Sequence, residues 1–290
     1  MDIKVEPKLL PFLKWAGGKR WLTSSQNDIF PSDFNTYIEP FLGSAAIYFH
    51  LAPKKALLSD LNQELIETYT AIKHDWKLVK RYLTKHHNSH SKDYYYKVRA
   101  AKPTLSNSKA ARMIYLNRTC WNGLYRVNLQ GRFNVPIGTK TNALLDTDDF
   151  EQTSKLLKGA KLSCCDFEET INKAESGDFV FVDPPYTVKH NYNGFIKYNQ
   201  TLFAWQDQER LKLAVDRAVH RGAKVLVLNA AHDSIRELYS EYSQQKLTRK
   251  NVLSGKSEYR GKYEELAVYC GYNSMPQQRL LSNRQAVAAS

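Results

Sequence analysis

A short apolar run that ends at two consecutive prolines constrains the fold of this chain more than any other stretch. Residues 178–182 (Asp-Phe-Val-Phe-Val) are aromatic and β-branched after the first position, which is typical of a buried strand. Pro184 and Pro185 cannot donate ladder hydrogen bonds, so the strand has to end at Asp183. The sequence therefore predicts an acidic residue, two prolines and Tyr186 at the carboxyl end of a strand, the edge where open α/β sheets bind ligands.

The tetrapeptide from Asp183 to Tyr186 carries groups that suit a planar heterocycle with an exocyclic amino group. Asp183 offers carboxylate acceptors, and the carbonyl of Pro184 offers another acceptor on a restrained backbone. Tyr186 offers a flat face on which a ring can stack. The alternative interpretation is a Pro-Pro turn that ends the strand beside an incidental aspartate, and further motifs are needed to distinguish the two.

A βαβ pattern in the N-terminal part of the chain predicts a nucleoside-binding unit. Strands are predicted at residues 36–39 and 55–60, with a tight turn at 40–45 and a helix from 46 to 51 between them. The second strand ends in Asp60, at the distance where such units accept ribose hydroxyls. Gly43 is the one glycine in the turn, which is too few for a pyrophosphate cradle. A cofactor with a ribose and no diphosphate fits this unit better.

The remaining patterns extend the α/β organisation, with one irregular region between. Strands are predicted at 161–166, 225–229 and 264–269, the last antiparallel, and helices at 110–116 and 207–220. Asn62 is a predicted N-cap for a helix that buries Leu65, Ile66, Tyr69 and Ile72. Residues 75–109 are basic and irregular in pattern. Within them, 92–99 interleave tyrosines with cations, either as a nucleic-acid face or, as we favour, as an amphipathic helix with packed tyrosines.

Composition restricts the partners and the compartment of this 290-residue chain. Its net charge of +13 favours a polyanionic partner, most often nucleic acid, over a merely soluble basic protein. No run of eighteen apolar residues and no N-terminal apolar block is present, so we expect a cytoplasmic protein without a membrane span. The four cysteines are expected to be reduced core thiols. His86, His87 and His90 are expected in a solvated loop, and no metal site is expected.

Two glycine-containing segments are predicted to approach ligands closely. Residues 12–19 place two glycines among lysines and a tryptophan, without the spacing of a P-loop; the alternative is a turn before the first helix. Further along, Asn122-Gly123 predicts a two-residue hairpin turn, and Gln130-Gly131 predicts another turn. A hairpin that carries Asn122, Leu124 and Arg126 fits a major groove, where arginine reads guanine edges and an apolar side chain touches a thymine methyl.

Four motifs, in this order, resemble the Dam-type DNA adenine-N6 methyltransferases of the D12 class, the α-group of amino-methyltransferases. They are residues 12–19, 39–43, 122–126 together with 133–136, and 183–186. The resemblance implies an α/β fold: a Rossmann-like S-adenosylmethionine-dependent methyltransferase sheet with an inserted, mostly helical target-recognition domain that carries a β-hairpin. It implies a catalytic domain at 1–70 and 159–272 and a recognition domain at 71–158. Residues 273–290 are expected to form a disordered tail.

The resemblance also implies roles for individual residues. The catalytic residues are Asp183, Pro184 and Tyr186. S-adenosylmethionine is contacted by Trp15, Lys19, Glu39, Phe41, Gly43, Asp60, Asp166, Phe167 and Asp183, with Asp60 on the ribose and Asp166-Phe167 near the adenine. Double-stranded DNA is contacted by Lys14, Trp121, Asn122, Leu124, Arg126 and Pro136. Ala45 departs from the family pattern, which commonly has a second glycine there, so an extra methyl group is expected near the cofactor.

The expected reaction is methyl transfer to N6 of an adenine that is flipped out of duplex DNA, within GATC. Asp183, in place of Ser or Asn, points by resemblance to adenine N6, and the absence of a Pro-Cys pair argues against cytosine carbon-5 chemistry. We expect a monomer, either solitary, phage-borne or paired with a restriction enzyme. Two alternatives stay open: an amino-methyltransferase that acts on RNA or protein, and a sequence-specific DNA-binding protein that has lost catalysis.

Overall fold

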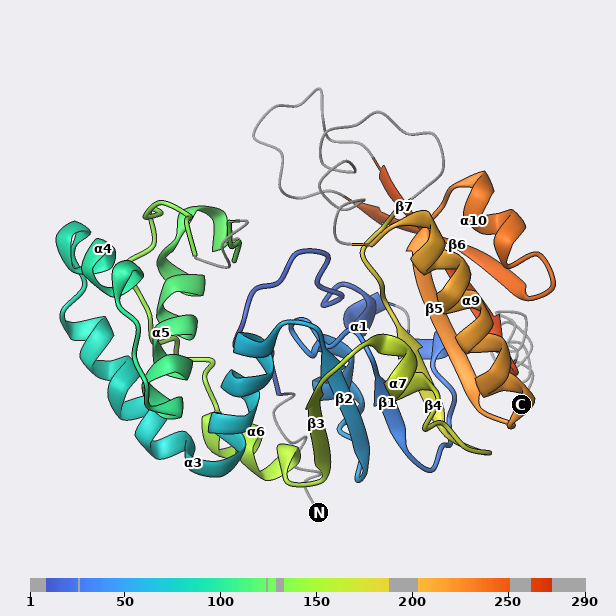
Figure 1. Ribbon diagram of the computed structural model, residues 1–290, viewed down its shortest axis with the longest axis horizontal. Helices are drawn as coiled ribbons and strands as arrows, with labels where there is room; N and C mark the ends of the chain where they lie inside the picture. The colour runs from blue at the N-terminus through green and yellow to red at the C-terminus, as the bar shows by residue number, and fades with distance from the viewer. Residues whose placement is uncertain are drawn as a thin grey trace, which may run out of the picture. The chain divides into compact units, whose positions relative to one another are not determined.

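The computed structural model describes residues 9–25, 27–123, 125–128, 133–187, 203–250 and 262–272 (Figure 1). Its contacts divide the chain into two compact units. Unit 1 comprises Met1–Thr23 and Thr36–Thr170, and unit 2 comprises Ser24–Asn35 and Ile171–Ser290. The described residues form a mixed α/β protein with seven strands, which confirms the predicted fold class.

Unit 1 contains three parallel strands in the order β3-β2-β1. They are β1 (Tyr37–Glu39), β2 (Ala56–Asp60) and β3 (Ala160–Cys164). The register pairs Glu39 with Leu58 and Asp60 with Cys164, so the carboxyl ends of the strands lie at one edge. Parallel neighbours require a crossover, and α2 (Ala46–Leu51) supplies it between β1 and β2, as the sequence pattern predicts.

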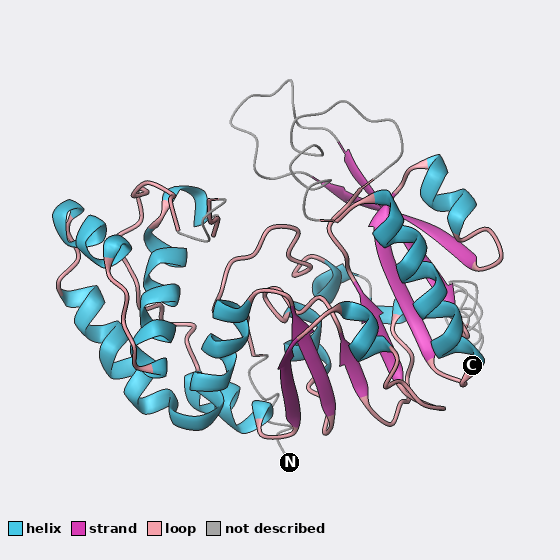
Figure 2. Cartoon of the chain, in the orientation of Figure 1, coloured by secondary structure: helices cyan, strands magenta, loops and turns pink. Residues whose placement is uncertain are grey.

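The segment between β2 and β3 is helical for most of its described length (Figure 2). It contains α3 (Gln63–Asn88), α4 (Lys92–Ala100), α5 (Ser106–Thr119), the 3-10 turn η2 (Trp121–Gly123) and α6 (Phe150–Leu157). The predicted N-cap is confirmed, because Asn62 Oδ1 accepts from Leu65 N at 3.0 Å. Leu65, Ile66, Tyr69 and Ile72 are all buried, as predicted.

Residues 75–88, whose basic and irregular pattern gave no helix prediction, are helical. The helix α3 continues to Asn88 with one kink at Asp75, whose φ of −149° is not helical. Asp75 Oδ1 accepts from Leu78 N at 3.0 Å, so the next turn is capped at once. Val79 and Leu83 of α3 are buried, and α3 packs on both α5 and α6. Such tertiary contacts stabilise helices whose polar sequences give a weak local signal.

The expectation of a solvated loop is wrong for His86 and His87, whereas His90 lies in the connection between α3 and α4 and is half-buried. His86 and His87 occupy the last turn of α3, and His86 Nδ1 is 2.8 Å from the hydroxyl of Tyr94 on α4. His90 makes the same kind of bond, at 2.8 Å, to the hydroxyl of Tyr115 on α5. The expectation of packed tyrosines is confirmed, since Tyr95 of α4 is fully buried.

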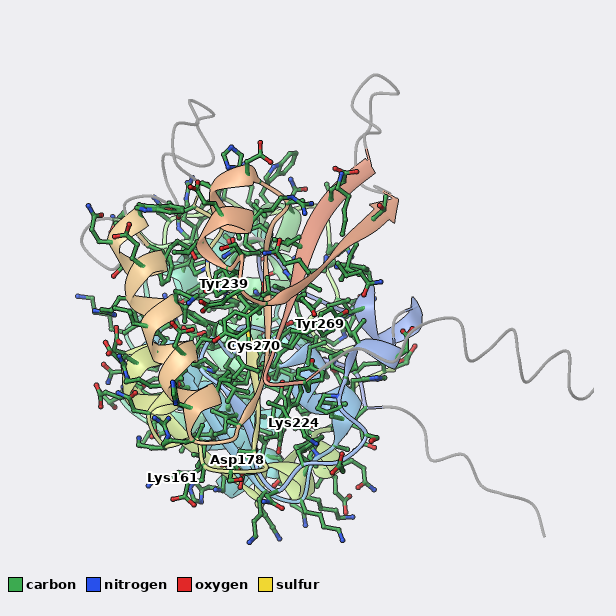
Figure 3. The ribbon with its side chains drawn as sticks, turned by 90° about the vertical axis from the view of Figure 1, so that its right-hand side faces the viewer. Lys161, Asp178, Lys224, Tyr239, Tyr269 and Cys270 are labelled. Atoms are coloured by element: carbon green, nitrogen blue, oxygen red, sulfur yellow. The ribbon has the colours of Figure 1, made fainter. Side chains whose placement is uncertain are left out.

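Unit 2 contains four strands in the order β4-β5-β7-β6. They are β4 (Phe179–Val182), β5 (Lys224–Ala230), β6 (Ser243–Lys250) and β7 (Lys262–Cys270). β4 and β5 are parallel, whereas β7 is antiparallel to both β5 and β6, which confirms the predicted direction of the last strand. Figure 3 labels Lys224 at the start of β5 and Tyr269 and Cys270 at the end of β7. The polar strand β6 was not predicted.

Short helices complete the described secondary structure. Unit 2 has α9 (Trp205–His220), which lies along β5 (Figure 1), and α10 (Asp233–Leu238). The others are α1 (Leu22–Ser25), η1 (Asn27–Ile29) and α7 (Phe167–Ile171). Within α9, Leu211, Ala214 and Ala218 are buried.

Several other expectations have mixed outcomes. All four cysteines are free, but only Cys120 and Cys270 are buried; Cys164 is exposed and Cys165 is half-buried. The predicted tail at 273–290 lies outside the described residues.

The division between a catalytic and a recognition domain stays a prediction; α3 continues through residue 70, the predicted boundary. Among the described helices, none is long and apolar enough to cross a membrane.

Candidate functional site

The turn after β1 is held by the carboxylate at the end of β2. Gly43 N donates to Asp60 Oδ2 at 3.1 Å, and Asn62 N donates to Asp60 Oδ1 at 2.9 Å. Burial raises the pKa of Asp60, while the two N–H groups act in the opposite direction. Each carboxylate oxygen has two acceptor positions, so Asp60 can hold the turn and still accept from a ligand hydroxyl.

Gly43 is required where Trp15 packs on this turn. Its φ is +47°, and a Cβ placed there would lie 2.9 Å from Trp15 Cδ1. Tyr69 fixes the other side of the turn, because its hydroxyl donates to Gly43 O at 3.1 Å. Lys19 belongs to the same loop as Trp15; its side chain is buried and its Nζ donates to Gly17 O at 2.8 Å. These contacts form a cradle that has no room for a larger residue at position 43.

Aromatic and apolar surfaces accompany the carboxylate of Asp60. Phe41, in the turn, stacks on Phe167 at the start of α7, with ring centroids 5.4 Å apart. Asp166 Oδ1 accepts from Glu168 N at 2.9 Å and so holds the start of the same helix. Leu61, which the sequence reasoning missed, is 65% exposed beside Asp60. A carboxylate next to apolar and aromatic surface is the combination of groups that suits a nucleoside.

Glu39 at the end of β1 and Ala45 at the end of the turn are both buried inside unit 1. Glu39 is 3% exposed and accepts from the hydroxyl of Tyr37 at 2.9 Å. Ala45 has a φ of 56°, in the left-handed region where glycine is favoured, which explains the glycine expected from the family pattern. Its exposed fraction is 1%, so its methyl group packs within the protein.

The predicted catalytic motif follows β4 in unit 2. Pro184 is buried, whereas Asp183 and Tyr186 are half-buried. The hydroxyl of Tyr186 donates to Glu265 Oε2 at 2.9 Å, across 79 positions of sequence. Burial raises the pKa of Tyr186 strongly, and the carboxylates of Asp183 and Glu265 raise it further. The motif therefore presents part of its surface while its phenol oxygen is anchored inside the unit.

A buried polar network holds the residue that follows the motif. Thr187 Oγ1 donates to Phe203 O at 2.6 Å, and Gln208 Nε2 of α9 donates to Thr187 O at 3.4 Å. Asn229, near the end of β5, donates to Gln208 Oε1 at 3.0 Å. Because these side chains are fully or almost fully buried, the hydrogen bonds satisfy groups that water cannot reach.

The described candidates for DNA contact are exposed on unit 1. They are Lys14, Trp121, Asn122, Arg126 and Pro136; Leu124 lies outside the described residues. The backbone beneath them is fixed. The buried Asn117 of α5 accepts from Lys14 N at 2.9 Å and donates to Lys14 O at 2.8 Å. Exposed side chains on a fixed backbone are suited to reading an extended partner.

The hairpin of this surface differs from the predicted one. Antiparallel bridges pair Cys120 with Ile137 and Val127 with Phe133, so the chain reverses between the members of the second pair. Asn122 and Gly123 both have positive φ, as a two-residue turn requires, but they form the 3-10 turn η2 within one arm. The local turn chemistry was identified correctly, while the pairing partners depend on tertiary contacts.

Tyr125 joins the hairpin to the loop that carries Trp15, a contact the sequence reasoning missed. The two rings stack with centroids 5.9 Å apart and an interplanar angle of 17°. Tyr125 also contacts Phe133 on the other arm and donates its hydroxyl to Glu64 near the start of α3. Its position between two predicted DNA-contact residues is the one signal that pointed to it.

Comparison with known proteins identifies the family. Residues 15–254 match the model of the D12 class N6 adenine-specific DNA methyltransferases, which is most of the chain. The chain belongs to this family. A type II methyltransferase of Lactococcus lactis subsp. cremoris, M1.LlaDCHI, is 35% identical over 269 residues, which cover 90% of this chain and 95% of that protein. The chain is an adenine-specific DNA methyltransferase of the D12 class.

Other relatives match this chain with similar sequence identity and over a similar share of its length. The type II methyltransferase M.MjaIII of Methanocaldococcus jannaschii is 34% identical, covering 88% of this methyltransferase and 97% of the relative. A DNA adenine methylase of Haemophilus influenzae is 29% identical, covering 93% and 96%. The matches span both units of the fold. Within the described residues, no group of three His, Cys, Asp or Glu side chains is arranged to hold a metal ion.

Proposed function

We propose that this methyltransferase transfers a methyl group from S-adenosylmethionine to N6 of an adenine that is flipped out of duplex DNA, within the sequence GATC. The observation that carries the proposal is the motif after β4, where Asp183 and Pro184 offer acceptors beside the anchored ring of Tyr186. Adenine N6 is an exocyclic amino group on a planar ring, which matches those groups in hydrogen bonding and in shape.

Unit 1 supplies residues that fit the cofactor. S-adenosylmethionine contains a ribose, an adenine and no diphosphate, and it supplies a methyl group on a positively charged sulfonium when bound. Asp60 would accept from the ribose hydroxyls, since its oxygens retain acceptor positions beyond the turn. Phe41, Phe167 and Leu61 would pack on the adenine. Trp15 and Lys19 would complete the cradle over Gly43.

The base has to leave the duplex before it reaches the motif, at a cost of a few kcal/mol. Tyr186 would stack on the flipped adenine and recover part of that cost. Asp183 and the carbonyl of Pro184 would accept hydrogen bonds from the two N6–H groups and position the amino nitrogen. The bound cofactor would supply the methyl group: the new N6–carbon bond would replace the sulfonium–methyl bond, S-adenosylhomocysteine would leave, and N6 would lose one proton. These residues act by positioning and by electrostatics, and the proposal requires no covalent bond between enzyme and substrate.

The hairpin of unit 1 would read the DNA. Arg126 is exposed and suits bidentate recognition of a guanine edge, while Lys14 is a second cation on the same unit. Trp121 is 55% exposed and would take the space that the flipped adenine leaves in the stack. Asn122, Leu124 and Pro136 would contribute the other contacts, and GATC is the site that the family resemblance favours.

The test is to express the protein in a host without adenine methylation and to map N6-methyladenine across that genome. Methylation at every GATC supports the whole proposal. Methylation at another motif overturns the assigned reading by Lys14 and Arg126. Absence of methylation from a folded protein overturns the proposed reaction; duplex DNA, RNA and peptide acceptors then separate the alternatives.

Two variants sharpen the test. Asp183→Ala removes an acceptor for N6 and should abolish transfer while DNA affinity stays within about twofold. Asp93→Ala, on the exposed start of α4, is the matched control and should transfer at the wild-type rate. Retained turnover in Asp183→Ala overturns the catalytic assignment.

A further inference from the structure

The hydroxyl of Tyr186 lies beside two carboxylates of unit 2. Glu265 Oε2 accepts its hydrogen bond at 2.9 Å, and Asp183 is a second carboxylate within hydrogen-bonding reach of the phenol. Burial, and then both carboxylates, raise the pKa of the phenol. Glu265 is 8% exposed, whereas Tyr186 is half-buried. The oxygen end of the ring is thus held within the unit, and part of the residue remains open to a ligand.

Strand register explains why Glu265 reaches the motif. β7 is antiparallel to β5, so its first half lies beside the carboxyl end of β5, and Glu265 pairs with Ala230, the last residue of that strand. Val182, the residue before Asp183, pairs with Val227 on the other side of β5. The alternation of side chains along β7 leaves Glu264 exposed, in an ion pair with Lys246 at 2.8 Å.

Glu265 and Asp183 can both accept the single hydroxyl proton of Tyr186, which gives Glu265 a role beyond packing. A phenol carries one O–H, and a hydrogen bond donated to Glu265 withdraws that proton from Asp183. A buried carboxylate is costly unless it is hydrogen-bonded, so Glu265 holds the phenol strongly. The bond also restricts rotation and tilt of the Tyr186 ring.

We propose that Glu265 is a positioning residue for methyl transfer: it accepts the proton of Tyr186, sets the tilt of the ring that stacks on the target base, and keeps that proton from competing for the oxygens of Asp183. The inference rests on the proposed function, because it assumes that Tyr186 stacks on adenine and that Asp183 accepts from N6. It adds a residue from β7 to a motif that belongs to β4.

The test is a double-mutant cycle on Glu265 and Tyr186, read by single-turnover methylation of duplex DNA under saturating substrate. Glu265→Gln leaves a weaker, neutral acceptor, so the phenol proton shifts toward Asp183. We expect the rate constant to fall by about 10- to 100-fold, with the dissociation constant for DNA unchanged within about twofold. Glu264→Gln is the matched control on the opposite face of β7 and should keep the wild-type rate.

Repeating Glu265→Gln in the Tyr186→Phe variant shows whether Glu265 acts by positioning Tyr186 or by stabilising the fold. That variant keeps the ring and removes the proton, so Glu265→Gln should change its rate by less than about twofold. An equal loss in both backgrounds, or a large rise in the dissociation constant for DNA, overturns the proposal. Thermal unfolding of each variant identifies any loss that comes from misfolding.

A fluorescent base allows the role of Glu265 to be tested without relying on methyl transfer. Duplex DNA with 2-aminopurine at the target position brightens when the base leaves the stack and dims when an aromatic ring covers it. Glu265→Gln should change the bound-state intensity in the wild-type background and not in Tyr186→Phe. If the wild type transfers no methyl group, the proposed function fails, and this signal still decides whether Glu265 acts through Tyr186.

Discussion

Removing one partner of the buried ion pair between Arg118 and Asp148 should destabilise the protein strongly, because it leaves an uncompensated buried charge. The guanidinium of Arg118, on α5, donates to both carboxylate oxygens of Asp148 at 2.6 Å. It also donates to Phe12 O at 2.8 Å and to Ala143 O at 2.8 Å. The side chains are 4% and 5% exposed, so neither charge has water to replace its partner.

The expected cost follows from that burial. Asp148→Asn keeps the shape and removes the charge, which leaves a guanidinium buried without its counterion; breaking such a pair costs about 3–5 kcal/mol. The neutral amide retains part of the hydrogen bonding, so we expect the lower half of that range. For a chain of this size the loss corresponds to a fall in Tm of roughly 5–7 °C. Arg118→Met should lower the free energy of unfolding by a similar amount, because it leaves the buried carboxylate of Asp148 without its counterion.

Urea unfolding followed by circular dichroism measures the change. The double variant Arg118→Met/Asp148→Asn should be less destabilised than the sum of the single variants, because it leaves no unpaired charge. Glu264→Gln breaks a pair whose side chains are 48% and 42% exposed, and it should cost about 1 kcal/mol or less. A loss below about 1 kcal/mol in Asp148→Asn, or strict additivity in the double variant, would refute this reasoning.

Three further predictions concern pH, backbone strain and the aromatic contact. Burial lowers the pKa of His86 to about 4, below its unfolded value, so the folded state binds a proton less readily than the unfolded state. The contribution of His86 to the free energy of unfolding should be fully present above pH 6.5 and decrease as the pH falls toward 4. His86→Gln should flatten this part of a plot of urea midpoint against pH. Ala45→Gly relieves about 1–2 kcal/mol of strain in the left-handed backbone conformation, but it removes a buried methyl group and increases the entropy of the unfolded chain. The free energy of unfolding should therefore stay within about 1 kcal/mol of the wild type. The affinity for S-adenosylmethionine, measured by calorimetry, should stay within about twofold. Tyr125→Ala removes the ring stacked on Trp15 and should weaken DNA binding by about 2- to 10-fold in an anisotropy titration, whereas Tyr125→Phe should not; equal loss in both variants would assign the effect to the hydroxyl instead.

Local patterns in the sequence identified much of the framework. The apolar run before Asp183 became β4, the turn at 40–45 leads into α2 at the predicted residue, and Asn62 caps α3. These features depend on side-chain period, on proline and glycine chemistry and on caps, which act within a few residues of one another. The order of motifs also indicated the family that comparison with known proteins established.

Tertiary packing decided what those patterns did not contain. α3 continues through the polar stretch after Asp75, where Val79 and Leu83 are buried. His86 and His90 are hydrogen-bonded to the hydroxyls of Tyr94 on α4 and Tyr115 on α5. The hairpin arms pair at Cys120 and Val127, although the turn chemistry at Asn122 suggested a reversal there.

The candidate site divides in the same way. The sequence by itself determined which residues we propose for the chemistry: the carboxylate of Asp60 after a strand, and the acceptors and ring from Asp183 to Tyr186. Only the tertiary structure decided that Asp60 holds the turn at Gly43, and that Glu265 accepts the proton of Tyr186 across 79 positions. The reason is physical: a hydrogen bond between distant residues depends on strand register and burial, which arise from the packing of the whole unit and leave no periodic trace in the sequence.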